Sequence, residues 1–344
     1  MAKAAKTVDS GVSKFQDALD KLNKAYGVGT VLTLDSKSNL NYDLISTGSI
    51  GFDNITLGVG GFVKGKLYEL MGWEGSGKST ICGHAVAECQ KAGGTVLYID
   101  GEHAVDKNYF EALGVDTAKM LIAQPSCGEE GFQIAMDMIN TGDIDLVIID
   151  SDSSLIPKKV LDGDVGDSSI GKKALLNSNA YPKLKSALSE HNVCVIVVSQ
   201  YREKIGMMFG NPTTTQGGHA LKFYTDCRIE VSKSLAKDGD VNYGNITKVK
   251  AIKNKMSSPY QLHSFEIIYG TGIDKLGEIM ELINEYGIGR KYGKTMTIGE
   301  HKYDLEQFKG MLTDNQEFYD EIKKEILEKI NQKEPSKIEE DVEN

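Results

Sequence analysis

Through the middle of the chain, short runs of apolar residues alternate with segments of helical periodicity. The expected strands are Lys66–Met71, Thr95–Asp100, Leu121–Ala123, Asp145–Asp150 and Val193–Ser199. Helical stretches lie between them, at residues 79–91, near 130–140 and near 173–190. Strands that are apolar along most of their length are typical of a parallel sheet covered by helices on both faces. The pattern therefore predicts an α/β fold with a mostly parallel central sheet.

The segments that flank this core follow a different pattern. Residues 12–26 place their apolar side chains on one face of an amphipathic helix, and Thr30–Leu34 follows as a short strand. This helix-strand unit cannot bury both of its elements alone, so we expect it to dock on another surface. Beyond the core, Ala220–Ser232, Ile246–Lys253 and His263–Tyr269 look like strands added at the edge of the sheet.

The last third of the chain and two interruptions of the core complete the pattern. Residues 275–331 return to helical periodicity and are expected to form a small C-terminal α/β lobe, and residues 332–344 an acidic, disordered tail. Two polar, glycine-rich stretches interrupt the core, at Asp162–Ser169 and at Gly206–Gly218, where apolar residues also occur. Long loops inside compact domains are usually functional or disordered. These two are therefore candidate binding loops.

Composition narrows the class of protein. The net charge of −10 argues at first against a nucleic-acid partner, but part of it lies in the acidic tail, so a DNA groove elsewhere stays open. The five cysteines form no C-x-x-C pair and the six histidines do not cluster, which indicates reduced thiols in a cytoplasmic protein rather than disulfides or zinc. No apolar run reaches membrane-spanning length, and we expect no signal peptide.

The most specific motif follows the first predicted strand of the core. Its eight residues fit G-x-x-x-x-G-K-[ST] and run Gly72-Trp73-Glu74-Gly75-Ser76-Gly77-Lys78-Ser79. Glycines in such a loop let backbone N–H groups point at phosphate oxygens, and the following helix adds its positive end. Lys78 can reach the β- and γ-phosphates, and the Ser79 hydroxyl can bind Mg²⁺. The motif predicts binding of ATP or GTP.

Three polar residues close neighbouring predicted strands. Asp150 ends an apolar strand and is placed to bind Mg²⁺, usually through water. Glu102 follows another strand and is a candidate general base, although a solvated loop acid fits its spacing equally well. Gln200 closes the last strand and could hydrogen-bond a γ-phosphate, with the same alternative.

Several further segments identify a family. They are Ile45–Ser49, Asp100–Asp106, Gly166–Ser168, Met208–Pro212, Gly217–Tyr224 and Lys253–Lys255. In this order and spacing, and together with the phosphate loop, they closely resemble the bacterial RecA recombinase family. The resemblance covers roughly residues 12 to 275 and weakens in the last lobe. It implies a P-loop ATPase core of the RecA type.

The resemblance also implies the parts of an ATP site. ATP would be bound by Gly72–Ser79, with Thr80 at the α-phosphate and with Asp106 and Tyr109 at the adenine base. Ser79 would bind Mg²⁺ directly.

For hydrolysis, the resemblance implies that Glu102 activates water, Asp150 holds the Mg²⁺ shell and Gln200 senses the γ-phosphate. Lys253 and Lys255 resemble a pair that reaches across a protomer interface to ATP bound by a neighbour, as an arginine finger does. A solvated basic turn is the alternative for this pair.

The two glycine-rich loops would bind DNA at the axis of a helical filament. Basic side chains and backbone N–H groups can neutralise phosphates, while Met and Phe can insert between unstacked bases. A Met/Phe cluster is more often part of a core, but glycine, asparagine and proline flank this one. The assigned residues are Asp164, Gly166, Ser168, Ser169, Lys172, Lys173, Arg202, Lys204, Met208, Phe209, Asn211, Thr214, Gly217 and Gly218.

The chain also departs from the family pattern. Leu175 stands in place of a DNA-contacting arginine, Thr213 in place of a glutamate, and Trp73 in place of the usual proline of the phosphate loop. Ser79 replaces a threonine and keeps its hydroxyl. The last lobe lacks the family's typical tryptophan region. These departures slightly favour a phage-encoded over a chromosomal member.

The expected domains are an N-terminal polymerisation element (1–38), an ATPase core (39–274) with DNA-binding loops near 162–169 and 201–218, a C-terminal lobe (275–331) and the tail (332–344). The expected function is an ATP-dependent recombinase. It would form a filament on single-stranded DNA and exchange strands with duplex DNA in recombination, repair and the SOS response. A ring-forming helicase or motor on the same core and a non-catalytic recombination mediator are the alternatives.

Overall fold

The computed structural model describes residues 5–26, 31, 42–164, 171–203, 213–215 and 219–332. The chain divides into two units, residues 1–43 and residues 44–344. In the first unit, α1 (Ala5–Tyr26) begins earlier than the helix predicted from residue 12. The side chain of Asn23 bonds both backbone groups of Val31, at 2.9 and 3.0 Å. Apart from Val31, the predicted strand Thr30–Leu34 lies outside the described residues.

The second unit is built on a twisted sheet with a parallel half. Its strands are β3 (Leu67–Gly72), β7 (Cys194–Glu203), β6 (Leu146–Asp150), β4 (Val96–Asp100) and β5 (Leu121–Ala123), side by side in this order. All neighbouring pairs among them are parallel. The predicted mostly parallel α/β core is therefore confirmed. Because β5 is the last strand in this direction, its outer edge is unpaired within the described part of the chain.

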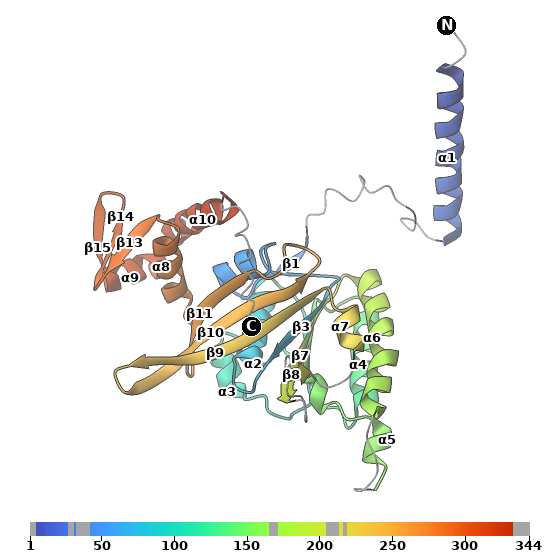
Figure 1. The fold of residues 1–344 in the computed structure, drawn as a ribbon, viewed down its shortest axis with the longest axis horizontal. Coiled ribbons are helices and arrows are strands. Elements are labelled where there is room, and N and C mark those ends of the chain that lie inside the picture. The colour runs from blue at the N-terminus through green and yellow to red at the C-terminus, as the bar shows by residue number, and fades with distance from the viewer. Residues whose placement is uncertain are drawn as a thin grey trace, which may run out of the picture. The chain divides into compact units, whose positions relative to one another are not determined.

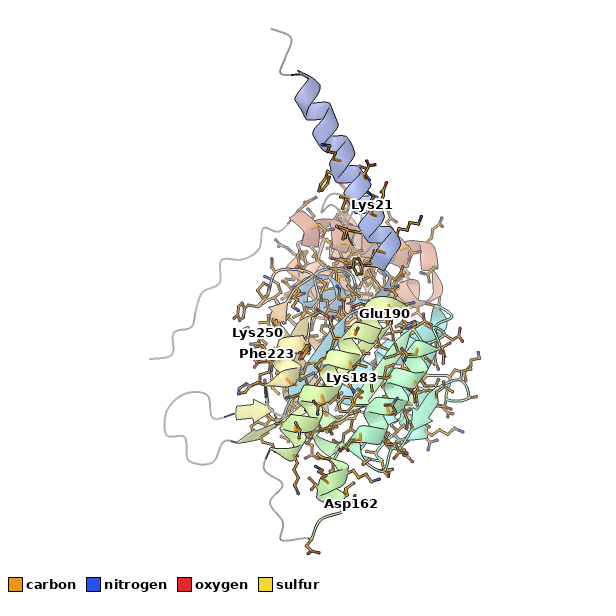
Figure 2. The ribbon with its side chains drawn as sticks, turned by 90° about the vertical axis from the view of Figure 1, so that its right-hand side faces the viewer. Lys21, Asp162, Lys183, Glu190, Phe223 and Lys250 are labelled. Carbon is orange, nitrogen blue, oxygen red and sulfur yellow. The ribbon has the colours of Figure 1, made fainter. Side chains whose placement is uncertain are left out.

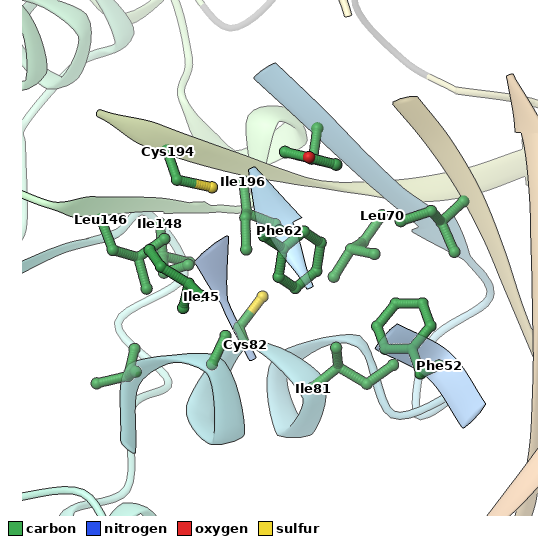
Figure 3. Close-up of a cluster of buried hydrophobic side chains, with 14 of the residues drawn as sticks. Ile45, Phe52, Phe62, Leu70, Ile81, Cys82, Leu146, Ile148, Cys194 and Ile196 are labelled. Carbon is green, nitrogen blue, oxygen red and sulfur yellow. The ribbon is translucent and has the colours of Figure 1, made fainter. Parts of the chain in front are cut away.

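Helices cover both faces of the parallel strands (Figure 1). On one face, α2 (Lys78–Lys91) packs on a core that includes Ile81, Cys82, Leu70 and Ile196 (Figure 3). On the other face lie α4 (Gly128–Asn140) and α6 (Lys172–His191). Short helices α3 (Lys107–Ala112) and α5 (Lys158–Leu161) connect the strands. Burial on both faces explains why these strands are apolar at consecutive positions.

The antiparallel half of the sheet extends from the other side of β3. It consists of β9 (Cys227–Asp238), β10 (Val241–Asn254), β11 (Leu262–Ile268) and β12 (Gly272–Ile273). The first strand, β9, is parallel to β3, and each later strand is antiparallel to its neighbour. Added strands at the edge were predicted here. The predicted strand at Ala220–Ser232 is wrong at its start, because Ala220–Tyr224 forms a short helix, α7.

Smaller elements surround this sheet. Short strands β1 (Leu44–Ile45) and β2 (Phe62–Val63) pair, a π-helical turn (η2) spans Phe52–Thr56, and β8 (Thr213–Thr215) pairs with the end of β7. Among the residues that the structure describes, no helix is both long and apolar enough to cross a membrane.

The C-terminal region has its own core. Helices α8 (Lys275–Glu285), α9 (Leu305–Asp314) and α10 (Gln316–Gln332) pack with a three-stranded antiparallel sheet. The strands are β13 (Gly289–Tyr292), β14 (Thr295–Ile298) and β15 (His301–Asp304). The helical periodicity of this region did not indicate where these three short strands lie.

Candidate functional site

The phosphate loop lies at the carboxyl edge of the parallel strands. Strand β3 ends at Gly72, and α2 begins at Lys78. A side chain at Gly72 would place its Cβ 2.1 Å from the carbonyl oxygen of Val231 on β9. Gly77 has φ +99°, in the left-handed region that favours glycine. Glycine is therefore required at both ends of the turn that brings the backbone to the amino end of α2.

Lys78 folds back over this loop. Its ammonium donates to the carbonyl oxygens of Trp73 at 2.7 Å and Gly72 at 3.1 Å. Burial lowers the pKa of Lys78, and the nearby carboxylates of Asp150 and Glu102 oppose that effect. A longer contact reaches the Ser76 hydroxyl at 3.5 Å. A buried ammonium satisfied only by such neutral oxygens would gain a stronger, charge-assisted partner in a phosphate.

A pair of oxygen ligands lies beside the loop. The Asp150 carboxylate at the end of β6 accepts hydrogen bonds from the Ser79 and Tyr98 hydroxyls, both at 2.7 Å. Burial raises the pKa of Asp150, while these two hydrogen bonds lower it. Oxygen donors of this kind suit Mg²⁺, which proteins usually hold with one or two side chains plus phosphate oxygens. Within the described ranges no three His, Cys, Asp or Glu side chains gather to hold a metal ion.

Glu102 and Gln200 meet at the same edge. The Gln200 amide donates to Oε1 of Glu102 at 2.7 Å, and the Ser151 hydroxyl donates to the same oxygen at 2.6 Å. Arg202 in turn donates to the Gln200 carbonyl oxygen at 2.9 Å. Glu102 is exposed to solvent, yet two donors fix the direction of its carboxylate.

The residues expected at the adenine base lie close to the first turn of α2. The Tyr109 and Thr80 hydroxyls are 2.7 Å apart. Asp106 caps α3 by accepting a hydrogen bond from the Tyr109 backbone N–H at 3.0 Å. The structure thus brings the phosphate loop, Thr80 and Tyr109 into one neighbourhood.

Lys253 and Lys255 lie elsewhere, toward the amino edge of the parallel strands. Lys253 pairs across the ladder with Arg228, which pairs with Glu69, three positions before Gly72. The step from Gly72 back to Glu69 is about 10 Å along the strand, and the phosphate loop continues in the opposite direction. Lys255 lies past the end of β10 and is further away still.

Both lysines have partners in their own chain. The Lys253 ammonium donates to the carbonyl oxygens of Lys222 at 2.7 Å and Phe223 at 3.3 Å, at the end of α7. Lys255 forms an ion pair with Asp226 at 3.3 Å. The structure therefore does not bring this pair to the phosphate loop of the same chain.

Much of the expected DNA interface lies outside the described residues. This applies to Gly166, Ser168, Ser169, Lys204, Met208, Phe209, Asn211, Gly217 and Gly218. The backbone of Thr214 belongs to β8, and Asp164 and Arg202 are exposed. On α6, Lys172 is partly exposed, whereas the ammonium of Lys173 is turned inward, 2.7 Å from the Leu155 carbonyl oxygen.

Residue patterns missed three groups at this edge. Ser151 orients Glu102, Tyr98 bonds to Asp150, and Asp152 is 1% exposed beneath them. The signal for Ser151 and Asp152 was their position directly after Asp150. Tyr98 could have been noticed as the one side chain with a polar tip between Val96 and Ile99 of β4.

Together the fold and the phosphate loop define a P-loop ATPase with a RecA-type core. A family model for the RecA N-terminal domain matches residues 13–274. Protein RecA of Cytophaga hutchinsonii is 45% identical over 319 residues, covering 92% of this chain and 90% of that protein. Protein RecA of Porphyromonas gingivalis is 42% identical, with 92% and 94% covered, and that of Aquifex aeolicus is 42% identical, with 90% and 91% covered.

The chain belongs to the bacterial RecA family. Its function is that of an ATP-dependent DNA recombinase in recombination and repair, with DNA-dependent ATPase activity. This decides against the helicase and mediator alternatives.

Proposed function

We propose that the chain binds ATP and Mg²⁺ at Gly72–Ser79 and hydrolyses ATP with Glu102 as general base. Lys253 and Lys255 of a neighbouring copy complete the site within a helical filament on DNA. The observation that carries this proposal is the separation of the two groups: the phosphate loop and the lysine pair lie toward opposite edges of one sheet. A site that needs both must be shared between copies.

In the proposed reaction, Lys78 leaves the Trp73 carbonyl oxygen for the β- and γ-phosphates. Ser79 would bind Mg²⁺ directly and Asp150 would hold its water shell, and the ion would neutralise charge on the phosphate oxygens. Glu102 accepts the proton of the attacking water through its carboxylate. A γ-phosphate would attract the amide N–H of Gln200, which now donates to Glu102 at 2.7 Å. Gln200 is thus placed to report nucleotide state to β7 and the segment that follows it. Asp106 and Tyr109 would contact the adenine base.

Exposed apolar surface supports the proposed self-association. On the edge strand β5, Leu121 and Ile122 are 42% and 48% exposed. On α1, Phe15, Leu22 and Tyr26 are exposed as well. Surfaces of this kind need cover. A head-to-tail contact between copies that does not close into a ring generates a filament.

We assign DNA binding to residues near 162–169 and 201–218, with Arg202 and Lys172 as the described cations best placed to meet phosphates. Residues 1–38 would serve polymerisation, 39–274 form the ATPase core, 275–331 the C-terminal lobe and 332–344 the tail. The five cysteines, none of them disulfide-bonded, fit a cytoplasmic protein.

Mixing two inactive variants tests the shared site. Glu102→Gln removes the base, and Lys253→Ala/Lys255→Ala removes the lysines; each alone should lose DNA-dependent ATPase by at least about 100-fold. In a 1:1 mixture on single-stranded DNA, some sites are intact. These sites combine the phosphate loop and Glu102 of a lysine variant with the two lysines of a Glu102→Gln neighbour. Random assembly head to tail makes these about a quarter of all sites, so about a quarter of wild-type activity should return.

No recovery in the mixture would place the lysines in the same chain's site or outside it. Mixing Glu102→Gln with Lys78→Ala is the matched control, because both changes lie on the phosphate-loop side. In that mixture no site is intact, so activity should stay absent.

A further inference from the structure

A buried polar cluster lies next to the carboxyl edge of the parallel strands, where Glu102 and Asp150 are found. Asp152 begins the short 3₁₀ turn η3 (Asp152–Ser154) and is 1% exposed. Its carboxylate accepts hydrogen bonds from the Tyr181 hydroxyl at 2.7 Å and the Asn177 amide at 3.2 Å. The Lys173 ammonium is 3.4 Å away and also donates to the Leu155 carbonyl oxygen at 2.7 Å. Asp152 is thus surrounded by three donors.

All three donors belong to one face of α6. Residues 173, 177 and 181 are four apart, which places them one above another along the helix. Asn177 and Tyr181 are fully buried, and the Lys173 side chain is 19% exposed. Burial lowers the pKa of Lys173, and Asp152 opposes the shift. Since a buried carboxylate is costly unless paired and hydrogen-bonded, these contacts fix η3 against α6.

The amino end of this turn also contacts Glu102, the proposed general base. Ser151 immediately precedes Asp152 and donates to Oε1 of Glu102 at 2.6 Å. Ser151 and Ser154 cap η3 reciprocally, so the turn cannot shift at one end alone. Only one peptide bond therefore separates the residue held by α6 from the residue that orients Glu102.

The first turn of α6 carries Lys172, next to Lys173. Lys172 is partly exposed, and its ammonium lies 3.4 Å from the carbonyl oxygen of Lys159. We propose that Asp152 and the three α6 side chains bonded to it are positioning residues that transmit DNA binding at the start of α6 to Glu102. A small displacement of α6 moves η3 with it, and Ser151 then changes the direction of the Glu102 carboxylate. The inference rests on the proposed roles of Glu102 and Lys172.

Two other roles for the cluster make different predictions. If Lys173 contacts DNA directly, its loss weakens single-stranded DNA affinity and lowers the salt dependence of binding by about one phosphate contact. If the cluster only stabilises the fold, its loss lowers the melting temperature but leaves the turnover of folded protein unchanged. An Asp152 variant distinguishes the first role from the proposal. A buried carboxylate cannot touch DNA, so direct DNA contact by Lys173 does not account for an effect of changing Asp152.

The experiment measures ATP turnover of the full chain without DNA and with saturating oligo(dT), plus KM for ATP, oligo(dT) affinity and thermal melting. Asp152→Asn and Lys173→Met should each reduce the ratio of stimulated to basal turnover about tenfold, the effect of losing one charged hydrogen bond. KM and oligo(dT) affinity should stay within about twofold of wild type. Lys173→Arg should restore most of the ratio.

Lys183→Met is the matched control, since Lys183 is an exposed lysine on the same helix (Figure 2). It should leave the ratio unchanged. If Asp152→Asn fails to fold, Asp152→Asn/Lys173→Met removes both charges together, and Tyr181→Phe removes one hydroxyl while keeping the ring that packs edge-on against Phe132. Both should lower the ratio, Tyr181→Phe by about two- to threefold.

An unchanged ratio in folded Asp152 and Tyr181 variants would overturn the proposal. So would a loss of oligo(dT) affinity in Lys173→Met with the ratio intact. Glu102→Gln in the same assay distinguishes failure of the proposed function from failure of the positioning role. Normal turnover in that variant would overturn the role of Glu102 as general base. Loss of turnover there, with a normal Asp152→Asn, would overturn the positioning role alone.

Discussion

The parallel and antiparallel halves of the central sheet differ in the partners of their polar and charged side chains. At the carboxyl edge of the parallel half, Ser79 bonds to Asp150 and Gln200 bonds to Glu102, so the side chains of the site contact one another. In the antiparallel half, Lys253 is bonded to the carbonyl oxygens at the end of α7. The first half is assembled within a single chain. In the proposed filament, the lysines of the second half would serve the ATP site of a neighbouring copy, so that each copy would contribute to two different ATP sites.

The largest effect that would sharpen this contrast is expected at Lys78. Lys78→Ala removes two or more charged hydrogen bonds to phosphate, so ATP affinity should fall about 10²–10⁴-fold. Calorimetric titration of the DNA-free protein with ATP and Mg²⁺ measures it. Lys91→Ala, at the far end of the same helix, is the control and should bind normally. An affinity within twofold of wild type for Lys78→Ala would show that the loop does not hold the phosphates.

The lysine half should behave in the opposite way. Lys253→Ala/Lys255→Ala should leave ATP affinity of the DNA-free protein within about twofold, yet reduce DNA-stimulated turnover about 10²–10³-fold, because charge stabilisation is lost only in the assembled site. The same titration and a coupled ATPase assay give both numbers. Loss of ATP affinity in DNA-free protein would break the comparison, since it would place the lysines in their own chain's site.

A third effect concerns the contact between the two halves. His84 on α2 accepts a hydrogen bond from the Ile273 N–H of β12 at 2.9 Å, and burial lowers its pKa to about 4. The folded state thus favours neutral His84, so this stability is full above pH 6.5 and is lost as pH falls toward 4. A decrease of the His84 pKa from its ordinary value of 6.5 to about 4 corresponds to about 3 kcal/mol of unfolding free energy.

Urea unfolding at several pH values measures this loss. His84→Gln keeps an acceptor but cannot titrate, so its stability should fall less than that of wild type between pH 6.5 and 4. His191→Gln, at the end of α6, should behave as wild type does. Parallel curves for wild type and His84→Gln would contradict the prediction.

The smallest effect is expected at Ser79. Ser79→Ala should raise the Mg²⁺ concentration needed for half-maximal ATP binding about tenfold, the equivalent of one oxygen ligand or hydrogen bond. Ser79→Thr keeps the hydroxyl and should stay within about threefold of wild type. Titrating Mg²⁺ at fixed ATP checks both variants. Equal Mg²⁺ requirements for the alanine and threonine variants would remove Ser79 from the metal site.

Much of the parallel half could be predicted from the sequence. Its strands β4, β6 and β7 are buried on both faces, so each contains a continuous run of apolar residues. The phosphate loop could also be predicted, because its glycines are required. Gly72 lies too close to the Val231 carbonyl oxygen for a side chain, and Gly77 has a positive φ. By contrast, Ala220–Tyr224 resembled the start of a strand, because a five-residue apolar segment is too short for periodicity to distinguish helix from strand.

Tertiary contacts explain what the sequence could not provide. Lys173 was expected at DNA, but its side chain is satisfied by Asp152, a partner 21 positions earlier that no local pattern reveals. The contact between Ser151 and Glu102 likewise depends on tertiary structure. It forms because β4 and β6 end side by side, with Asp100 paired to Asp150. The location of Lys253 relative to the phosphate loop required the register of β10 on β9 and of β9 on β3.

One consequence concerns observation rather than catalysis. Trp73 is the only tryptophan of the chain, 46% exposed, with its ring edge-on to Tyr201 at 6.0 Å. Its carbonyl oxygen receives the Lys78 ammonium. The emission of an indole changes with the polarity around it, so the departure of Lys78 toward a phosphate should alter the fluorescence of this one residue. The molecule therefore carries its own optical probe at the nucleotide site, one that can follow ATP arrival and release in real time without a label.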